Sequence, residues 1–179
     1  MYGRWLAGVG RLPEAIAASK RAGGSLGTYL MAGGQFAAAR QAISRALELN
    51  PEAIPISNEA GRLELLEGRA QEALTVFRRI GPESIRQCGI AMSEHTLGHA
   101  KESQQALDEL AAKHALNSAD QIAEVYAWRG ERERAFEWLQ RAYTQHDNGL
   151  SSIKYDPLFA KLRADARYAA TLRKMNLPE

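Results

Sequence analysis

The sequence is poor in the features that many functional classes need. Its single cysteine, Cys88, cannot form a disulfide within the chain, so the fold must hold without one. The net charge of +2, from 23 Lys and Arg against 21 Asp and Glu, is too small to indicate a nucleic-acid or anionic-membrane partner. No apolar run approaches the roughly 18 residues of a membrane span, and the N-terminus lacks a continuous signal core. These absences predict a cytoplasmic protein.

Signals for catalysis are also missing. The chain contains no glycine-rich phosphate loop, no nucleophile elbow and no carboxylate pair set apart from compensating charges. His95 and His99 have the spacing of metal ligands on one helix face, but Gly98 is expected to end the helix between them and no third ligand accompanies them. Cys88 has no neighbour in sequence that would activate it. We therefore expect no enzyme activity, no metal site and no cofactor in this chain.

What the sequence does have is a recurring glycine with a small residue five positions later. The pairs are Gly34 and Ala39, Gly68 and Ala73, Gly98 and Ser103, and Gly130 and Ala135. The glycines step by 34, 30 and 32 residues, a period typical of helix-turn-helix repeats. Glycine accepts a left-handed backbone at the turn, and the small residue lets the second helix pack closely on the first. The spacing predicts four helical hairpins over residues 23–147.

The N-terminal end departs from this period. Gly10 and Ala15 repeat the five-residue spacing, but only nine residues precede Gly10. We interpret residues 1–22 as a partial repeat whose first helix is cut short, and Gly23-Gly24 as the break before the first complete repeat. This interpretation predicts that the natural protein continues upstream.

The C-terminal end changes character after residue 147. Asn148-Gly149 favours a turn with positive φ. Asp156-Pro157 provides a cap and a first-turn proline, which predicts a short helix to about Leu162. A last helix is expected around Ala166–Met175. We assign residues 148–179 to a C-terminal helical cap, because terminal units of repeat proteins are often atypical.

The fourth unit carries a resemblance to a known family. Five of its residues fall where the tetratricopeptide repeat has an aromatic, a turn, a small, a bulky and a second small residue. In that order they are Tyr126, Gly130, Ala135, Leu139 and Ala142. The first complete unit matches through Gly34, Ala39, Ala46 and Pro51. The chain thus resembles tetratricopeptide repeat proteins over roughly residues 23–147. It departs from them where Ser103 replaces an alanine, where Glu64 and Glu94 replace an aromatic residue, and in lacking the early tryptophan.

The C-terminal sequence is similar to a bacterial subgroup of this family. The similar segments are Arg129-Gly130-Glu131, Ala135-Phe136-Glu137-Trp138-Leu139, Arg141-Ala142-Tyr143, Asp156-Pro157-Leu158-Phe159, Leu162-Arg163, Asp165-Ala166-Arg167-Tyr168 and Leu177-Pro178. Such domains commonly form the C-terminal part of signalling proteins that carry class III adenylate cyclase, winged-helix or protein kinase domains. The resemblance implies that any catalytic activity lies in an upstream domain.

The resemblance implies an all-α, right-handed superhelix of stacked helix-turn-helix repeats with a C-terminal helical cap, as a single domain over residues 1–179. The first helix of each repeat would line a concave groove for an extended peptide or a partner helix. The groove-facing candidates are Thr28, Asn58, Arg62, Cys88, Met92, His95, Asp120, Glu124 and Trp128. Gly24, Thr28 and Glu59 stand where some family members clamp a C-terminal carboxylate with lysines and asparagines, which argues against that ligand.

Two functions remain open from sequence. The first is a protein-interaction or regulatory module that binds a protein or peptide partner in the groove. The alternative is a structural spacer or homodimerisation element of a multidomain adenylate cyclase or transcription regulator. The groove positions could also simply face solvent or an adjoining domain.

Overall fold

The protein is all-helical in the part that is described. The computed structural model describes residues 2–22 and 25–178, so the predicted break at Gly23-Gly24 lies outside it. These residues form α-helices and short 3-10 helices and contain no strand, which confirms the all-α class. Among the described helices, none combines the length and apolar composition needed to cross a membrane.

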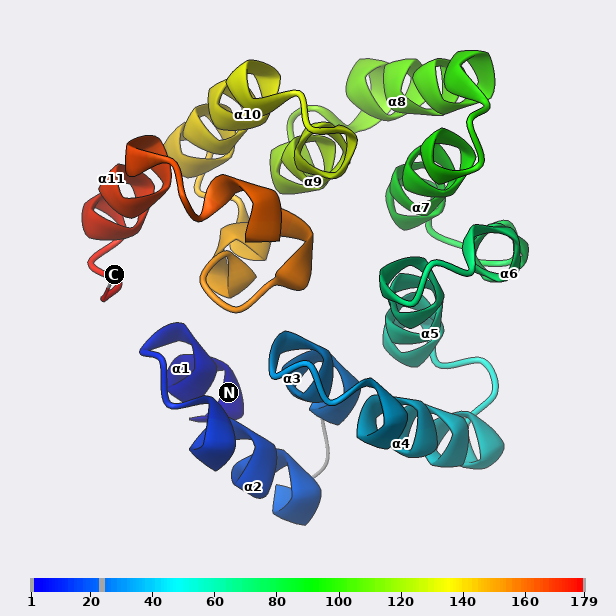
Figure 1. The fold of residues 1–179 in the computed structure, drawn as a ribbon, viewed down its shortest axis with the longest axis vertical. Helices are drawn as coiled ribbons and strands as arrows, with labels where there is room; N and C mark the ends of the chain where they lie inside the picture. Colours follow the sequence, from blue (N-terminus) through cyan, green and yellow to red (C-terminus); the bar gives the residue numbers. More distant parts are fainter. Residues whose placement is uncertain (1, 23–24, 179) are drawn as a thin grey trace.

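Consecutive helices pair into hairpins that follow one another around a ring (Figure 1). The first helix of each hairpin faces the inside of the ring; these inner helices are α1 (Tyr2–Gly8), α3 (Leu26–Ala32), α5 (Ile54–Leu66), α7 (Glu83–Thr96) and α9 (Ala119–Arg129). The second helices lie outside; they are α2 (Leu12–Ala22), α4 (Phe36–Leu49), α6 (Ala70–Phe77), α8 (Ala100–His114) and α10 (Arg132–Thr144). The inner helices therefore present their exposed faces to one shared concave surface.

The hairpin turns form as the glycine spacing predicts. The five glycines at these turns all have positive φ, between 69° and 86°: Gly10, Gly34, Gly68, Gly98 and Gly130. At Gly130 the glycine N–H donates to the carbonyl of Ala127 at 3.1 Å, and the N–H of Glu131 donates to the carbonyl of Tyr126 at 2.9 Å. The same pair of bonds closes the other four turns. Only glycine adopts this conformation without a steric cost, which explains the period.

Positive φ near the C-terminus occurs at a different residue from the one predicted. His146 has φ 55°, and the following Asp147 N–H donates to the carbonyl of Ala142 at 2.9 Å, as in the glycine turns. The expectation of positive φ at Asn148-Gly149 is therefore wrong. These two residues instead begin the 3-10 helix η1 (Asn148–Ser152), because the carboxylate of Asp147 accepts the N–H of Gly149 at 3.1 Å.

The small residues after the turns are buried between paired helices. Ala39, Ala73 and Ala135 are fully buried, and Ser103 is 1% exposed. The Ser103 hydroxyl donates to the carbonyl of Ala91 in the partner helix at 2.5 Å. Serine therefore fits this position because its one polar atom is paired inside the hairpin.

The two glutamates that replace aromatic residues join neighbouring helices by ion pairs. Glu64 pairs with Arg40 and Arg69, and Glu94 pairs with Arg78 at 3.0 Å. Charge pairing takes the place of aromatic packing at these two turns.

The C-terminal region turns into the ring. The predicted helices are present as η2 (Pro157–Leu162) and α11 (Ala166–Lys174), and α11 packs on the outer helix α10. Residues 148–165, which we call the inward segment, lie instead on the concave side next to α9 and reach α1 (Figure 1). Leu177, near the C-terminus, consequently lies beside α1, where its side chain is 3.8 Å from the position of a Cβ added at Gly8.

The inward segment connects the two hydrophobic cores of the protein. Its apolar side chains belong to the core formed by α5 to α11; they are Leu150, Ile153, Leu158, Phe159 and Leu162. Tyr155 belongs instead to the core of the N-terminal hairpins, where its ring meets Tyr29 edge-on at 5.5 Å. The segment is therefore an integral part of the fold.

Candidate functional site

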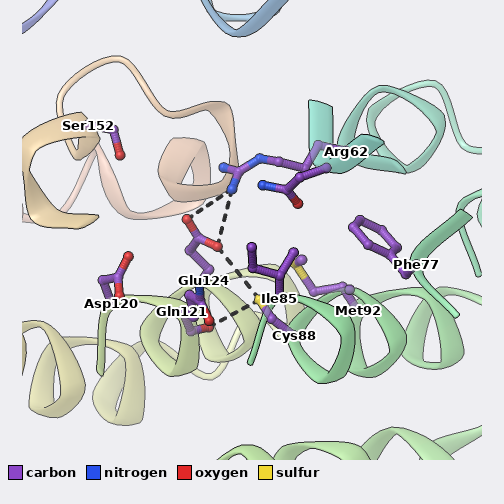
Figure 2. A pocket seen from close by; sticks show the side chains of 11 residues that line it. Arg62, Phe77, Ile85, Cys88, Met92, Asp120, Gln121, Glu124 and Ser152 are labelled. Carbon is purple, nitrogen blue, oxygen red and sulfur yellow. Dashed lines mark hydrogen bonds and ion pairs between the residues drawn. The ribbon is translucent and has the colours of Figure 1, made fainter. Parts of the chain in front are cut away.

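A polar pocket opens on the concave face between α5, α7, α9 and η1 (Figure 2). Its volume is about 190 Å³. Six of the nine groove residues predicted from sequence line it: Asn58, Arg62, Cys88, Met92, Asp120 and Glu124. Sequence reasoning missed the other five lining residues, which are Phe77, Ile85, Gly89, Gln121 and Ser152. Ile85 and Gln121 lie on the same inner helices as predicted residues, so the glycine register could have found them, whereas Ser152 comes from the inward segment.

The other three predicted residues lie outside the pocket. On α3, the Thr28 hydroxyl donates to Glu59 Oε1 at 2.7 Å. Trp128 Nε1 donates to the hydroxyl of Thr96 at 2.9 Å, and Lys161 of the inward segment lies 5.6 Å from the centre of the Trp128 ring. His95 is exposed on α7. The structure therefore does not bring all nine residues into one site.

The two histidines that have metal-ligand spacing lie on opposite sides of the turn at Gly98. Partial burial lowers the pKa of His95, and the nearby charges of Arg129 and Lys161 lower it further. His99 lies beyond the turn, with its Nδ1 2.8 Å from Glu94 Oε2. Within residues 2–22 and 25–178, no three His, Cys, Asp or Glu side chains are grouped so that they could hold a metal ion.

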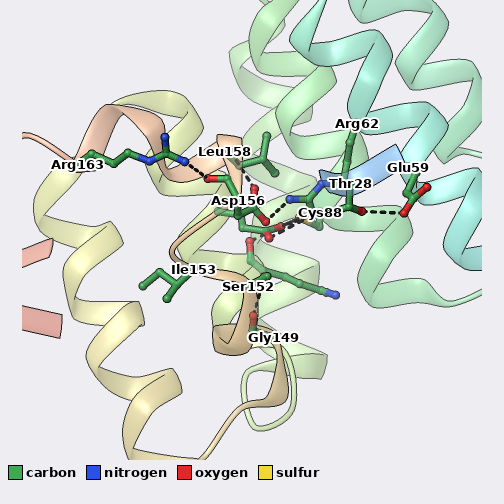
Figure 3. A network of polar contacts seen from close by, with 12 residues as sticks. Thr28, Glu59, Arg62, Cys88, Gly149, Ser152, Ile153, Asp156, Leu158 and Arg163 are labelled. Carbon is green, nitrogen blue, oxygen red and sulfur yellow. Dashed lines mark hydrogen bonds and ion pairs between the residues drawn. The ribbon is translucent and has the colours of Figure 1, made fainter. Parts of the chain in front are cut away.

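A buried ion-pair network forms the inner wall of the pocket (Figure 3). Arg62 of α5 donates through Nη1 to Glu124 Oε1 of α9 at 3.2 Å and through Nη2 to Asp156 Oδ2 of the inward segment. Their side chains are 16%, 6% and 4% exposed, so the charges have little access to water. Burial alone would lower the pKa of Arg62, but the charges of Asp156 and Glu124 offset burial and raise it. One guanidinium thus ties two inner helices to the inward segment.

Asp156 has a second role that sequence reasoning did identify. Its Oδ1 accepts the N–H of Leu158 at 2.9 Å and caps η2, as the Asp-Pro dipeptide predicts. The two oxygens of the carboxylate therefore serve different partners, one local and one 94 residues away. The sequence contains a signal only for the local one.

Glu124 and Cys88 share the floor of the pocket. The Cys88 thiol lies 3.7 Å from Glu124 Oε2 and 3.5 Å from the carbonyl of Gln121 (Figure 2). Burial raises the pKa of both groups well above their usual range, and each is raised further by the other carboxylates of the network. Cys88 is therefore a thiol at neutral pH and a poor nucleophile.

Asp120 lies at the opposite end of the pocket against the start of η1. Its carboxyl group is packed against Gly149 so closely that a Cβ at position 149 would come within 1.6 Å of Asp120 Oδ2. Asp147 Oδ2 accepts the N–H groups of Ala119 at 2.9 Å and of Asp120 at 3.4 Å, and so caps α9 from the next loop. Burial, followed by the neighbouring Asp147 carboxylate, raises the pKa of Asp120 to about 7.

Acceptors and acids predominate among the polar groups of the pocket. Asp120 and Glu124 both face it, while the guanidinium of Arg62 is shared between Glu124 and Asp156. Gln121 Oε1 is buried and has no hydrogen-bond partner. Chemically, the site can receive donors and positive charge.

Comparisons with protein-family models, with curated proteins and with solved structures found no match to this chain. The proposed function therefore rests on the geometry of the concave face.

Proposed function

We propose that this chain is a tetratricopeptide-like, right-handed superhelical module of a bacterial, cytoplasmic signalling protein, and that it binds a peptide or partner domain on its concave face. The glycine register and the inner and outer rows of helices support this architecture. One observation carries the functional part. The concave face already holds an irregular segment of polypeptide, the inward segment, by side chains from several inner helices.

The contacts to the inward segment are of the kind that recognise a bound peptide. A guanidinium of an inner helix pairs with the carboxylate of Asp156, and Tyr29 of α3 packs on Tyr155. Backbone contacts add to these side-chain contacts, because Lys161 Nζ donates to the carbonyl of Trp128 at 2.6 Å. A face built in this way can hold a second segment beside the first.

The partner is proposed to bind next to the inward segment and not in its place. Displacing the segment would expose its buried apolar side chains, and each large one contributes about 1.5 to 3 kcal/mol through burial. The pocket, in contrast, has a mouth formed by half-buried Asn58, Ile85 and Gln121. A partner side chain can enter there without any change in the fold.

To test this proposal, peptides that bind the full chain are first selected from a random display library. Asn58→Arg and Gln121→Arg each place a long side chain across the mouth of the pocket, and Gln71→Arg at an exposed position of α6 is the matched control. We expect each mouth variant to weaken peptide binding, measured by fluorescence anisotropy, about tenfold or more, and the control to leave it unchanged. Selected peptides that bind both mouth variants as tightly as the parent chain would contradict the proposal.

The dimerisation alternative is favoured by one observation on α1. Tyr2 and Trp5 are 62% and 56% exposed, and their rings stack with centroids 6.2 Å apart. Exposed aromatic residues of this kind often mark association surfaces. If Trp5→Ser converts a dimer into a monomer in sedimentation velocity while the peptide library yields no binder, the spacer or dimerisation function replaces the first proposal.

A further inference from the structure

A second groove runs along the outer helix α4, separate from the concave pocket. It has a volume of about 700 Å³ and is bounded on its other sides by the C-terminal end of α2 and the first two turns of α3 and α5. No residue lines both this groove and the concave pocket. We call it the α4 groove, after the six residues of α4 that line it, which are Ala38, Gln41, Ala42, Arg45, Ala46 and Leu49.

The apolar side chains of the α4 groove are open to solvent. Leu49 is 83% exposed. The other large or small apolar side chains along the groove are half-buried, and they include Leu26, Ala42, Ala46 and Ile56. Exposed apolar side chains that gather in one groove, in contrast to scattered single ones, are typical of an interaction surface. The groove therefore offers a partner apolar area that the core of the protein leaves uncovered.

The wall formed by α4 has the shape of a helix-binding surface. Its small residues recur every four positions, at Ala38, Ala42 and Ala46, so they lie on one face of the helix. Alanine lets a second helix approach closely, because no long side chain holds the two axes apart. At 1.5 Å per residue, the wall from Ala38 to Leu49 is about 16 Å long, which matches about three turns of a partner helix.

The rim of the α4 groove is positively charged. Lys20 and Arg45 are exposed, and neither side chain has an ion-pair or hydrogen-bond partner among the described residues. The acid among the lining residues, Glu59, is engaged by α3: the Thr28 hydroxyl donates to its Oε1 at 2.7 Å (Figure 3), and Gly27 leaves room for its Oε2. The two rim cations therefore favour a partner that supplies carboxylates.

We propose that the α4 groove docks an amphipathic helix of a partner protein, with apolar side chains at spacings of three and four and acidic side chains beside them. The apolar side chains pack on Ala42, Ala46 and Leu49. The acidic side chains pair with Lys20 and Arg45. This is a second interaction surface, in addition to the one proposed on the concave face.

The first experiment selects binders of the full chain from a display library of amphipathic helices of about four turns. Leucines are fixed at spacings of three and four, and the positions beside them vary among Glu, Gln and Lys. We expect glutamate to be enriched at these positions. The best binder, measured by fluorescence anisotropy, should bind at least about tenfold more tightly than the same peptide with its glutamates replaced by lysine.

Reversing the charge of the rim tests the assignment to this groove. The double variant Lys20→Glu, Arg45→Glu should bind the glutamate peptide at least about tenfold more weakly than the parent chain, and should bind the lysine peptide more tightly. Arg79→Glu, Lys101→Glu makes the same change in net charge at two exposed positions outside the groove and is the matched control, with no effect expected. Leu49→Ser should weaken binding while the preference for glutamate is kept. Circular dichroism checks that each variant keeps its helical content.

Three outcomes would overturn the inference: no binder from the library, no preference for glutamate over lysine, or equal binding by the parent chain and the charge-reversed variant. Selected helices that lose binding in Asn58→Arg but keep it in the charge-reversed variant bind at the concave pocket, which would overturn this inference and leave the proposed function standing. Binding that depends on the rim cations, in a chain for which the random library yields no ligand of the pocket, would support this inference and contradict the proposed function.

Discussion

The hairpin turns and the inward segment are held in place in opposite ways. A hairpin turn such as that at Gly130 closes through hydrogen bonds between residues at most five positions apart. The inward segment is held by Arg62 and Asp156, which are 94 residues apart, and by Tyr155 against Tyr29. Local backbone conformation therefore builds the repeats, whereas a few long-range side-chain contacts shape the concave face.

The largest effect on stability is expected at the ion pairs that Arg62 makes with Glu124 and Asp156. Arg62→Ala leaves the buried carboxylates of Glu124 and Asp156 without their cation, and breaking a buried ion pair typically costs about 3 to 5 kcal/mol. We expect a loss of this size in the free energy of unfolding, measured by urea denaturation.

The matched control is an arginine that pairs with carboxylates closer to solvent. Arg69 is 39% exposed and pairs with Glu64 and Glu67, so Arg69→Ala should cost about 1 kcal/mol or less. Equal losses of unfolding free energy in the two variants would show that the Arg62 ion pairs stabilise the fold no more than a surface ion pair does.

The next effect is a pH dependence that the turns should not have. The carboxyl group of Asp120 has a pKa of 3.8 in the unfolded chain and about 7 in the folded one. Because its folded pKa is raised, the folded state holds the proton more tightly, so the contribution of this group to stability is greatest below about pH 4 and declines as the pH rises to about 7. The slope contributed by one such group is at most about 1.4 kcal/mol per pH unit.

Asp120→Asn isolates this contribution. The lowered pKa of His95 acts in the opposite direction, so the informative quantity is the difference in unfolding free energy between the parent chain and Asp120→Asn at each pH. This difference should grow in favour of the variant from pH 4 to pH 7 and then level off. A constant difference would mean that the pKa of Asp120 is the same in the folded and unfolded chains. The carboxyl group would then not be buried next to Asp147 in solution.

The features that could be predicted from sequence are those that depend on local backbone conformation. The turns at Gly34, Gly68, Gly98 and Gly130 were predictable because a left-handed turn needs glycine wherever it occurs. Fixing these turns also fixes which residues of the preceding inner helix face inward, so Arg62, Asp120 and Glu124 could be placed on one surface from sequence, and all three line the pocket. The start of η2 at Asp156-Pro157 was predictable for the same local reason.

The remainder depends on contacts that no local pattern encodes. The sequence around Asp156 predicts a helix cap, but it contains no signal for Arg62 as a second partner. The sequence predicts a turn at Gly149, whereas in the structure the absence of a side chain there leaves room for the carboxyl group of Asp120. The position of the inward segment on the concave face follows from such contacts and could not be predicted.

The smallest expected effect concerns two turns that have the same hydrogen bonds but different residues. Gly130 has φ 81°, and a Cβ added there would meet no other atom within 4 Å, so Gly130→Ala should cost only the left-handed backbone penalty of about 1 to 2 kcal/mol. His146 already carries that penalty at φ 55°, and its side chain is exposed. His146→Gly should therefore stabilise the protein, by about 0.5 kcal/mol once the greater freedom of glycine in the unfolded chain is subtracted. Thermal and urea unfolding of both variants measure this contrast. If His146→Gly destabilises the protein as much as Gly130→Ala does, the imidazole contributes a stabilising contact and the two turns are not equivalent.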